Sequence, residues 1–125
     1  MKRLLFAVLM MVCSVSWAEW EKSGEANDYA VYSDKSTVRK KGKIATIWEM
    51  YDYSVVQTNE NGYRYNSEKV LLGYDCMTKK FARISTVYFF GSMGDGYVVA
   101  SKTEKKLFWA SVVLTRRLKI ACGEQ

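Results

Sequence analysis

The stretch KVLLGYDCMTKKFARISTVYFF, residues 69–90, decides the fold. Residues 69–76 and 80–90 are rich in Val, Ile, Leu, Tyr and Phe, which fit a pleated strand. Only Met77, Thr78 and Lys79 separate the two runs, and this spacing suits a hairpin turn. The stretch therefore predicts two antiparallel strands that lie side by side.

Alternation along these strands predicts which side chains share a face. Successive side chains of a strand point to opposite faces of the sheet. One face of the first strand should then carry Val70, Leu72, Tyr74 and Cys76. In the second strand we expect Thr86, Tyr88 and Phe90 to lie on the other face of the sheet.

Further strand-like runs surround this hairpin. They cover residues 29–33, 43–57 and 97–101. Polar or glycine-rich segments separate them and predict turns and loops: 36–41, read as a single helical turn, 58–67 and 91–96. Successive strands with short turns indicate an antiparallel meander.

The last segment has a different period. Leu114, Leu118, Ala121 and Cys122 recur at helical spacing, so residues 111–122 predict a helix. Ser111 is expected to cap its start and Gly123 to end it. The fold class is therefore α+β, with an antiparallel sheet and one carboxy-terminal helix packed on it.

The amino terminus predicts export. Residues 1–18, MKRLLFAVLMMVCSVSWA, have a positive start, a short apolar run and small residues before a cleavage point. The apolar run is too short to span a bilayer, so no transmembrane segment is expected. Cys13 follows bulky residues and is expected to leave with the signal peptide. What remains is one domain of 107 residues, 19–125, with a net charge of +4.

Two cysteines, Cys76 and Cys122, stay in the mature chain. In an oxidising compartment such a pair is expected to form a disulfide, which would tie the helix to the sheet. A redox-active pair is the alternative. Redox cysteines usually lie close together at a helix start, whereas these two are 46 positions apart.

Catalysis has little support in the sequence. The chain contains no histidine, so the commonest general base and metal ligand are missing. The segment GSMGDG, residues 91–96, lacks the Lys-Ser/Thr of a phosphate loop and is better explained as a hairpin turn. We predict no catalytic residue, no metal site and no cofactor, and hence no enzyme.

Two segments are candidates for binding. Arg39, Lys40, Lys41 and Lys43 form the densest basic run, which is either a solvated turn or a site for an anionic glycan, a lipid or an acidic protein. Residues 63–65, Tyr-Arg-Tyr, lie in a polar loop. They either pack on their own sheet or form an interaction hot spot. Export argues against nucleic acid as a partner.

A family resemblance adds to this interpretation. The matching residues are Trp20, Val31-Tyr32-Ser33-Asp34 leading into Ser36-Thr37-Val38-Arg39, Ile47-Trp48 before Tyr51-Asp52-Tyr53, Tyr74-Asp75-Cys76, Gly91-Ser92-Met93-Gly94, Trp109 and Cys122-Gly123. In their order and spacing the chain resembles the bacterial surface-adhesin protein E family. The resemblance implies a sheet of about six strands with a carboxy-terminal helix, in an extracytoplasmic protein.

Two hypotheses about function follow. The first is an exported binding module of the envelope of a Gram-negative bacterium, adhesin-like, that recognises host matrix or other extracellular macromolecules through loops and basic patches. The second is a periplasmic structural or accessory protein that binds envelope components. The sequence determines neither the ligand nor the oligomeric state, and it does not distinguish periplasm from cell surface.

Overall fold

A computed structural model describes residues 19–112 and 115–123. The strands are β1 (Trp20–Glu25), β2 (Tyr29–Lys41), β3 (Ile44–Thr58), β4 (Arg64–Asp75), β5 (Lys80–Phe90), β6 (Tyr97–Thr103) and β7 (Ala110–Ser111). The 3₁₀ turn η1 spans Ser92–Gly94 and the helix α1 spans Thr115–Cys122. The predicted signal peptide, residues 1–18, lies outside the described part of the chain.

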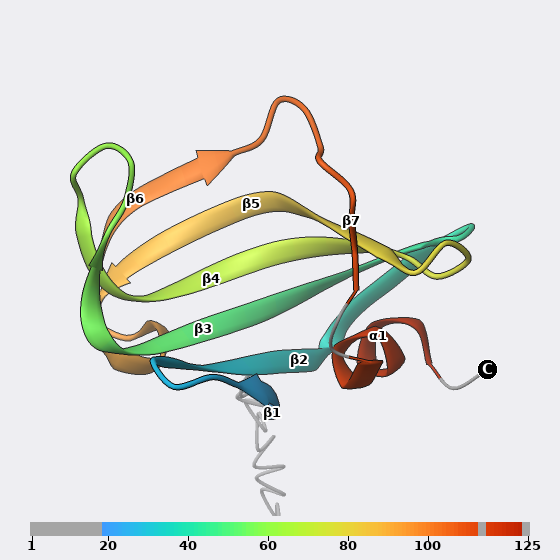
Figure 1. The fold of residues 1–125 in the computed structure, drawn as a ribbon, viewed down its shortest axis with the longest axis horizontal. Coiled ribbons are helices and arrows are strands. Elements are labelled where there is room, and N and C mark those ends of the chain that lie inside the picture. Colours follow the sequence, from blue (N-terminus) through green and yellow to red (C-terminus); the bar gives the residue numbers. More distant parts are fainter. Residues whose placement is uncertain (1–18, 113–114, 124–125) are drawn as a thin grey trace, which may run out of the picture.

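The strands form one antiparallel meander. They lie in the order β1-β2-β3-β4-β5-β6, and β7 pairs with β5 beyond the end of β6. Figure 1 shows a strongly curved sheet with α1 against one end of it. This arrangement confirms the predicted α+β fold, and the resemblance had implied the number of strands in the meander.

The disulfide between Cys76 and Cys122 is present, with the two Cα atoms 5.8 Å apart. It joins the residue directly after β4 to the last residue of α1, as predicted. Gly123 ends the helix with φ +80° and its N–H donates to the carbonyl of Lys119 over 2.8 Å. A left-handed residue at this position is the expected stop signal.

The face of the sheet that α1 covers, here called the helix face, contains the main core. Its buried members include Ile47, Val70, Leu72 and Tyr74, with Ala121 and Cys122 from the helix. The shared face predicted for β4 is therefore correct. On the opposite face, η1 packs near β3 and β4. There the N–H of Gly94 donates to the Ser67 hydroxyl over 2.8 Å.

The face predicted for the second half of β5 was wrong. Thr86 lies directly opposite Val70, and Tyr88 opposite Glu68, so both belong to the helix face. The cause is a bulge: Leu71 pairs with Ser85 but Leu72 pairs with Arg83. The extra residue, Ile84, reverses the alternation, and sequence alternation alone cannot reveal it. Phe90, two positions after Tyr88, is exposed and stacks on Tyr97 of β6.

The single helical turn expected at residues 36–41 was also wrong, because β2 continues to Lys41. Its register shifts between Asp34 and Arg39. At this irregularity the Asp34 carboxylate accepts bonds from the N–H and the hydroxyl of Ser36, and Thr37 donates to the Asp34 carbonyl. The polar residues that suggested a turn are therefore used for local side-chain bonds at an irregularity within a strand.

Two boundaries differ at the ends of the chain. The short strand β1 was not predicted, and it pairs with the first half of β2. The helix begins at Thr115 instead of near Ser111, because Ser111 pairs with Lys80 in β7. Ser111 therefore does not cap the helix. Leu114, expected on the helix stripe, lies outside the described residues.

Candidate functional site

The basic run lies at the β2–β3 turn. Arg39, Lys40, Lys41 and Lys43 are all exposed, and Gly42 makes the turn with φ +61°. Two of these side chains are tied to other elements. Lys40 Nζ donates to the carbonyl of Cys122 over 2.5 Å, and Lys43 Nζ lies 3.4 Å from the Asp75 carboxylate. Lys40 and Lys43 therefore help to hold the turn against α1 and the end of β4. Lys41 has no ion-pair partner among the described residues.

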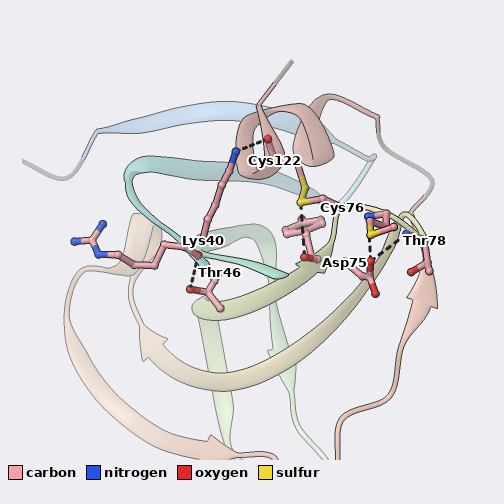
Figure 2. Close-up of a disulfide and its surroundings, with 9 residues drawn as sticks. Lys40, Thr46, Asp75, Cys76, Thr78 and Cys122 are labelled. Atoms are coloured by element: carbon pink, nitrogen blue, oxygen red, sulfur yellow. Dashed lines mark hydrogen bonds between the residues drawn. A yellow bond between two sulfur atoms is a disulfide. The ribbon is translucent and has the colours of Figure 1, made fainter. Parts of the chain in front are cut away.

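Two further lysines lie at this end of the sheet. Lys79, from the β4–β5 turn, and Lys119, from α1, line a hollow of about 240 Å³ with both cysteines of the disulfide. Figure 2 shows Lys40 reaching the Cys122 carbonyl beside the same disulfide. We call the set Arg39, Lys40, Lys41, Lys43, Lys79 and Lys119 the basic end. The predicted disulfide was the sequence signal that could have placed Lys79 and Lys119 near the basic run, because it brings their segments together.

Asp75 organises the turn next to the basic end. Its carboxylate accepts bonds from the backbone N–H groups of Met77 and Thr78, each over 3.0 Å. These bonds, the one from Thr78 foremost, hold the pKa of Asp75 below its ordinary value. Lys43 adds to the effect. The carboxylate therefore stays ionised and fixes the turn that carries Lys79.

The Tyr63-Arg64-Tyr65 segment divides between a loop and a strand. Tyr63 is in the β3–β4 loop and is 50% exposed, whereas Arg64 and Tyr65 already belong to β4. Tyr65 packs against Tyr53 and Tyr88, with ring centroids 5.7 and 4.7 Å away. Burial raises the pKa of Tyr65 to about 12, and Glu68 contributes. Packing on its own sheet therefore explains Tyr65, while Tyr63 and Arg64 remain exposed.

The two predicted binding segments do not form one site. The basic end adjoins the start of β3 at Ile44, and Tyr63 follows its end at Thr58. At about 3.3 Å per residue, these 15 residues place about 46 Å of strand, measured along its curved path, between the segments. A ligand that touches both must be a macromolecule.

Sequence reasoning missed a row of tyrosines on the helix face. Neighbouring rings lie 4.7–6.4 Å apart along the series Tyr29, Tyr51, Tyr53, Tyr65 and Tyr88. The row runs from the edge of α1 across the sheet to β5. Hollows of about 370, 380 and 290 Å³ lie beside it: Tyr29 lines the first and Tyr88 the third, and consecutive hollows share Phe81 or Lys102. The uncovered part of the helix face is therefore a shallow aromatic groove.

A buried ion pair closes one end of this groove. Arg117 of α1 donates to the Glu49 carboxylate, with the shortest contact 2.5 Å, and to the Tyr51 hydroxyl over 2.7 Å. Tyr74 and Ser33 also donate to Glu49. Burial alone would lower the pKa of Arg117, but bonding to Glu49 outweighs it and raises the pKa. The pair stays ionised and fully bonded, as a buried pair requires.

A second ion pair lies in the open part of the groove. Arg83 Nη2 and the Tyr53 hydroxyl both donate to Glu68 Oε1 over 2.9 Å. Burial and the neighbouring Glu68 raise the pKa of Tyr53. The Arg83 guanidinium lies 5.3 Å from the centre of the Tyr51 ring. This pair presents an arginine and several phenol rings to solvent, which is suitable chemistry for binding a polar surface.

The described residues give no sign of a metal centre or a membrane span. Within 19–112 and 115–123, no three Cys, Asp or Glu residues gather closely enough to hold a metal ion. In the same part of the chain, no helix is both long enough and apolar enough to cross a bilayer.

Comparisons with solved structures support the fold. Protein E of Haemophilus influenzae in crystal form II matches with a TM-score of 0.59 and 13% identity, over 80% of this chain and 91% of that one. Another structure, of protein E from non-typeable H. influenzae, gives a TM-score of 0.54 at 14% identity, over 86% of this chain and 75% of that one. No curated protein matches the sequence. At such identities the likeness concerns the fold alone.

A family model carries the assignment further. The model for surface-adhesin protein E matches residues 17–123, which is almost the whole domain. The match includes both cysteines of the disulfide and the Arg117 that closes the groove. The chain belongs to the surface-adhesin protein E family.

Proposed function

We propose that this chain is an exported, non-enzymatic, adhesin-like binding module of the bacterial envelope. It recognises host matrix or another extracellular macromolecule, and the basic end makes the first contact. Membership of the surface-adhesin family supports the adhesin-like role. The observation that carries the choice of surface is the convergence of lysines from two turns and a helix end around one disulfide.

The charges at the basic end favour an anionic target. Arg39, Lys41, Lys79 and Lys119 have no ion-pair partner among the described residues, whereas Lys43 is paired with Asp75. The disulfide and the Lys40 bond hold the contributing elements together. A preorganised cluster of cations suits a sulfated glycan or an acidic stretch of protein, and its effect should be screened by salt.

The β3–β4 loop provides a second contact. Tyr63 and Arg64 are exposed, and tyrosine and arginine are frequent at interaction hot spots. Since this loop and the basic end lie at opposite ends of the sheet, a long matrix protein or glycan could engage both. A small ligand could engage only one.

Charge reversal tests the basic end. In Lys41→Glu with Lys79→Glu, we expect binding to immobilised heparan sulfate and to acidic matrix proteins to fall about tenfold or more, because two attractive contacts become repulsive. Surface plasmon resonance at several salt concentrations measures this, and the wild type should weaken steeply with salt. Lys22→Glu with Lys35→Glu is the control, because it reverses the same number of charges at two exposed lysines that do not belong to the basic end. Equal losses in both variants would mean that only net charge matters, and would refute the proposed site.

Protease accessibility on intact bacteria tests the location. Digestion on intact cells, with a periplasmic protein protected in the same tube, would support adhesion. Digestion only after the outer membrane is opened would overturn adhesion in favour of a periplasmic accessory protein that binds envelope components.

A further inference from the structure

The connection between β6 and β7, residues 104–109, forms a projecting loop. Figure 1 shows it rising beyond the edge of the sheet. Its last three residues are Leu107, Phe108 and Trp109, all exposed, and Phe108 has 73% of its surface in solvent. Three consecutive exposed large apolar side chains in one loop are unusual on a protein surface, and such patches mark interaction sites.

The loop is held rigidly at both ends. The N–H of Glu104 donates to the carbonyl of Ile84 over 2.9 Å, and Ala110 pairs with Phe81 of β5. Part of the Trp109 indole lies over Gly73: a Cβ at Gly73 would be 3.5 Å from Cη2 of the ring. These contacts fix the return of the loop to the sheet, where Phe108 lines the hollow of about 380 Å³ with Phe81 and Arg83, so little order needs to be gained on binding.

Positive charge lies directly beside these apolar side chains. Lys105 and Lys106 precede Leu107, and Lys106 Nζ lies 5.9 Å from the centre of the Phe108 ring. The neighbouring carboxylates Glu104 and Glu60 are both paired with Lys102, over 3.3 and 2.8 Å. Lys102 offsets only one of these two carboxylates, so the three lysines and two glutamates together carry a net charge of +1. The loop combines exposed apolar side chains with two lysines that have no ion-pair partner among the described residues.

We propose that this loop docks the protein onto an anionic lipid surface. Phe108 and Leu107 enter the interfacial region, Trp109 lies at headgroup depth, and Lys105 and Lys106 contact the lipid phosphates. Aromatic side chains with adjacent lysines are the combination that favours membrane interfaces. Three side chains offer far less than the roughly 800 Å² per partner of an ordinary protein interface, whereas a lipid surface requires no matching shape.

Vesicle flotation tests the proposal. The wild type and all variants are exported and purified in their processed form. Mass spectrometry verifies that they all begin at the same amino-terminal residue. The probes are vesicles of phosphatidylglycerol with phosphatidylcholine, and of phosphatidylcholine alone. We expect Phe108→Ser to lower partitioning about tenfold or more, because it removes the most exposed aromatic ring. Lys105→Ala with Lys106→Ala should lower it by a similar factor on anionic vesicles only.

A matched variant and a depth probe make the outcome decisive. Met77→Ser removes another apolar side chain, 76% exposed, from the β4–β5 turn, and should leave partitioning unchanged. Brominated acyl chains should quench fluorescence in the wild type but not in Trp109→Phe. Equal partitioning of Phe108→Ser and wild type, or equal losses in Phe108→Ser and Met77→Ser, would overturn the proposal. The proposal would also be overturned if the wild type bound neither kind of vesicle. If Phe108→Ser then abolished binding to a purified protein partner, the loop would be a protein-docking loop.

Discussion

Two glutamates on the helix face are each paired with an arginine and a tyrosine, but the two pairs differ in what covers them. Glu49 meets Arg117 from α1, 68 positions away, and the side chains are 0% and 10% exposed. Glu68 meets Arg83 from the adjacent strand, and Arg83 is 39% exposed. A Glu–Arg pair bonded to a tyrosine thus lies under α1 in the covered half of the helix face, and a similar pair lines the open half.

The two pairs show where the groove ends and where it is open to solvent. The Glu49 pair and the disulfide both attach α1 to the sheet, so one end of the tyrosine row is sealed. Nothing among the described residues covers the Glu68 pair in the same way, and its arginine reaches solvent. We therefore expect changes in the covered half to affect folding, and changes in the open half to affect the surface.

Removal of the disulfide should give the largest effect. Replacing Cys76 and Cys122 by Ser opens a loop of 46 residues, which in the chain-entropy model corresponds to about 4 kcal/mol of unfolding free energy. Urea unfolding of wild type and variant measures the difference. A wild type in which reducing agent leaves the unfolding midpoint unchanged would contradict the role given to this bond.

Loss of Arg117 should have the next largest effect. Arg117→Met keeps the apolar stem but leaves Glu49 buried without its cation. Breaking such a pair costs about 3 kcal/mol or more. Chemical unfolding with the disulfide intact gives the value, and Arg116→Met is the control because Arg116 is exposed and pairs with Glu21 at the surface. A loss as small as that of the control would mean that Glu49 becomes neutral or hydrated when alone.

The two pairs also mark the limit of sequence reasoning. Apolar runs and turn residues predicted five of the strands, the hairpin at Met77–Lys79 and the helix, because these signals are local. The disulfide followed from the compartment and from counting cysteines. The basic run was found as a run, but Lys79 and Lys119 join it only in space. Glu49 and Glu68 gave no signal, because a glutamate in a strand usually faces solvent and its distant arginine is invisible locally.

The bulge at Ile84 had the widest consequence for prediction. It moves Thr86 and Tyr88 to the helix face and so places Tyr88 in the tyrosine row. Without it, alternation assigns the last half of β5 to the wrong face. One inserted residue in a long strand leaves no compositional trace, so the open groove could not be predicted.

A change at Arg83 should have a smaller effect than the change at Arg117. In Arg83→Met we expect a loss of about 1 kcal/mol, since Glu68 still accepts a bond from Tyr53 and water can reach the vacated side. The same unfolding assay applies. A loss equal to that of Arg117→Met would show that the open half is as dry as the covered half, and would remove the distinction between them.

The smallest effect should appear in the ionisation of the tyrosines. Burial raises the pKa of Tyr65 from its ordinary value of 10.0 to about 12, because Tyr65 lies in the open half and is only partly covered. A folded-state pKa above the unfolded value means that the protonated phenol stabilises the fold below about pH 10. This contribution disappears as the pH rises from 10 toward 12. Near-ultraviolet absorbance should show a phenolate transition near pH 12 that Tyr65→Phe removes.

Tyr74 is the matched residue in the covered half, because its hydroxyl donates to Glu49 and its pKa is raised by burial. Its phenol should ionise only when the chain unfolds, so Tyr74→Phe should leave the transition near pH 12 intact while lowering the stability at neutral pH. If both variants removed the same transition, water and hydroxide would reach both halves equally. The difference between the Glu49 and Glu68 pairs would then lie in the length of chain that each bridges rather than in their access to solvent.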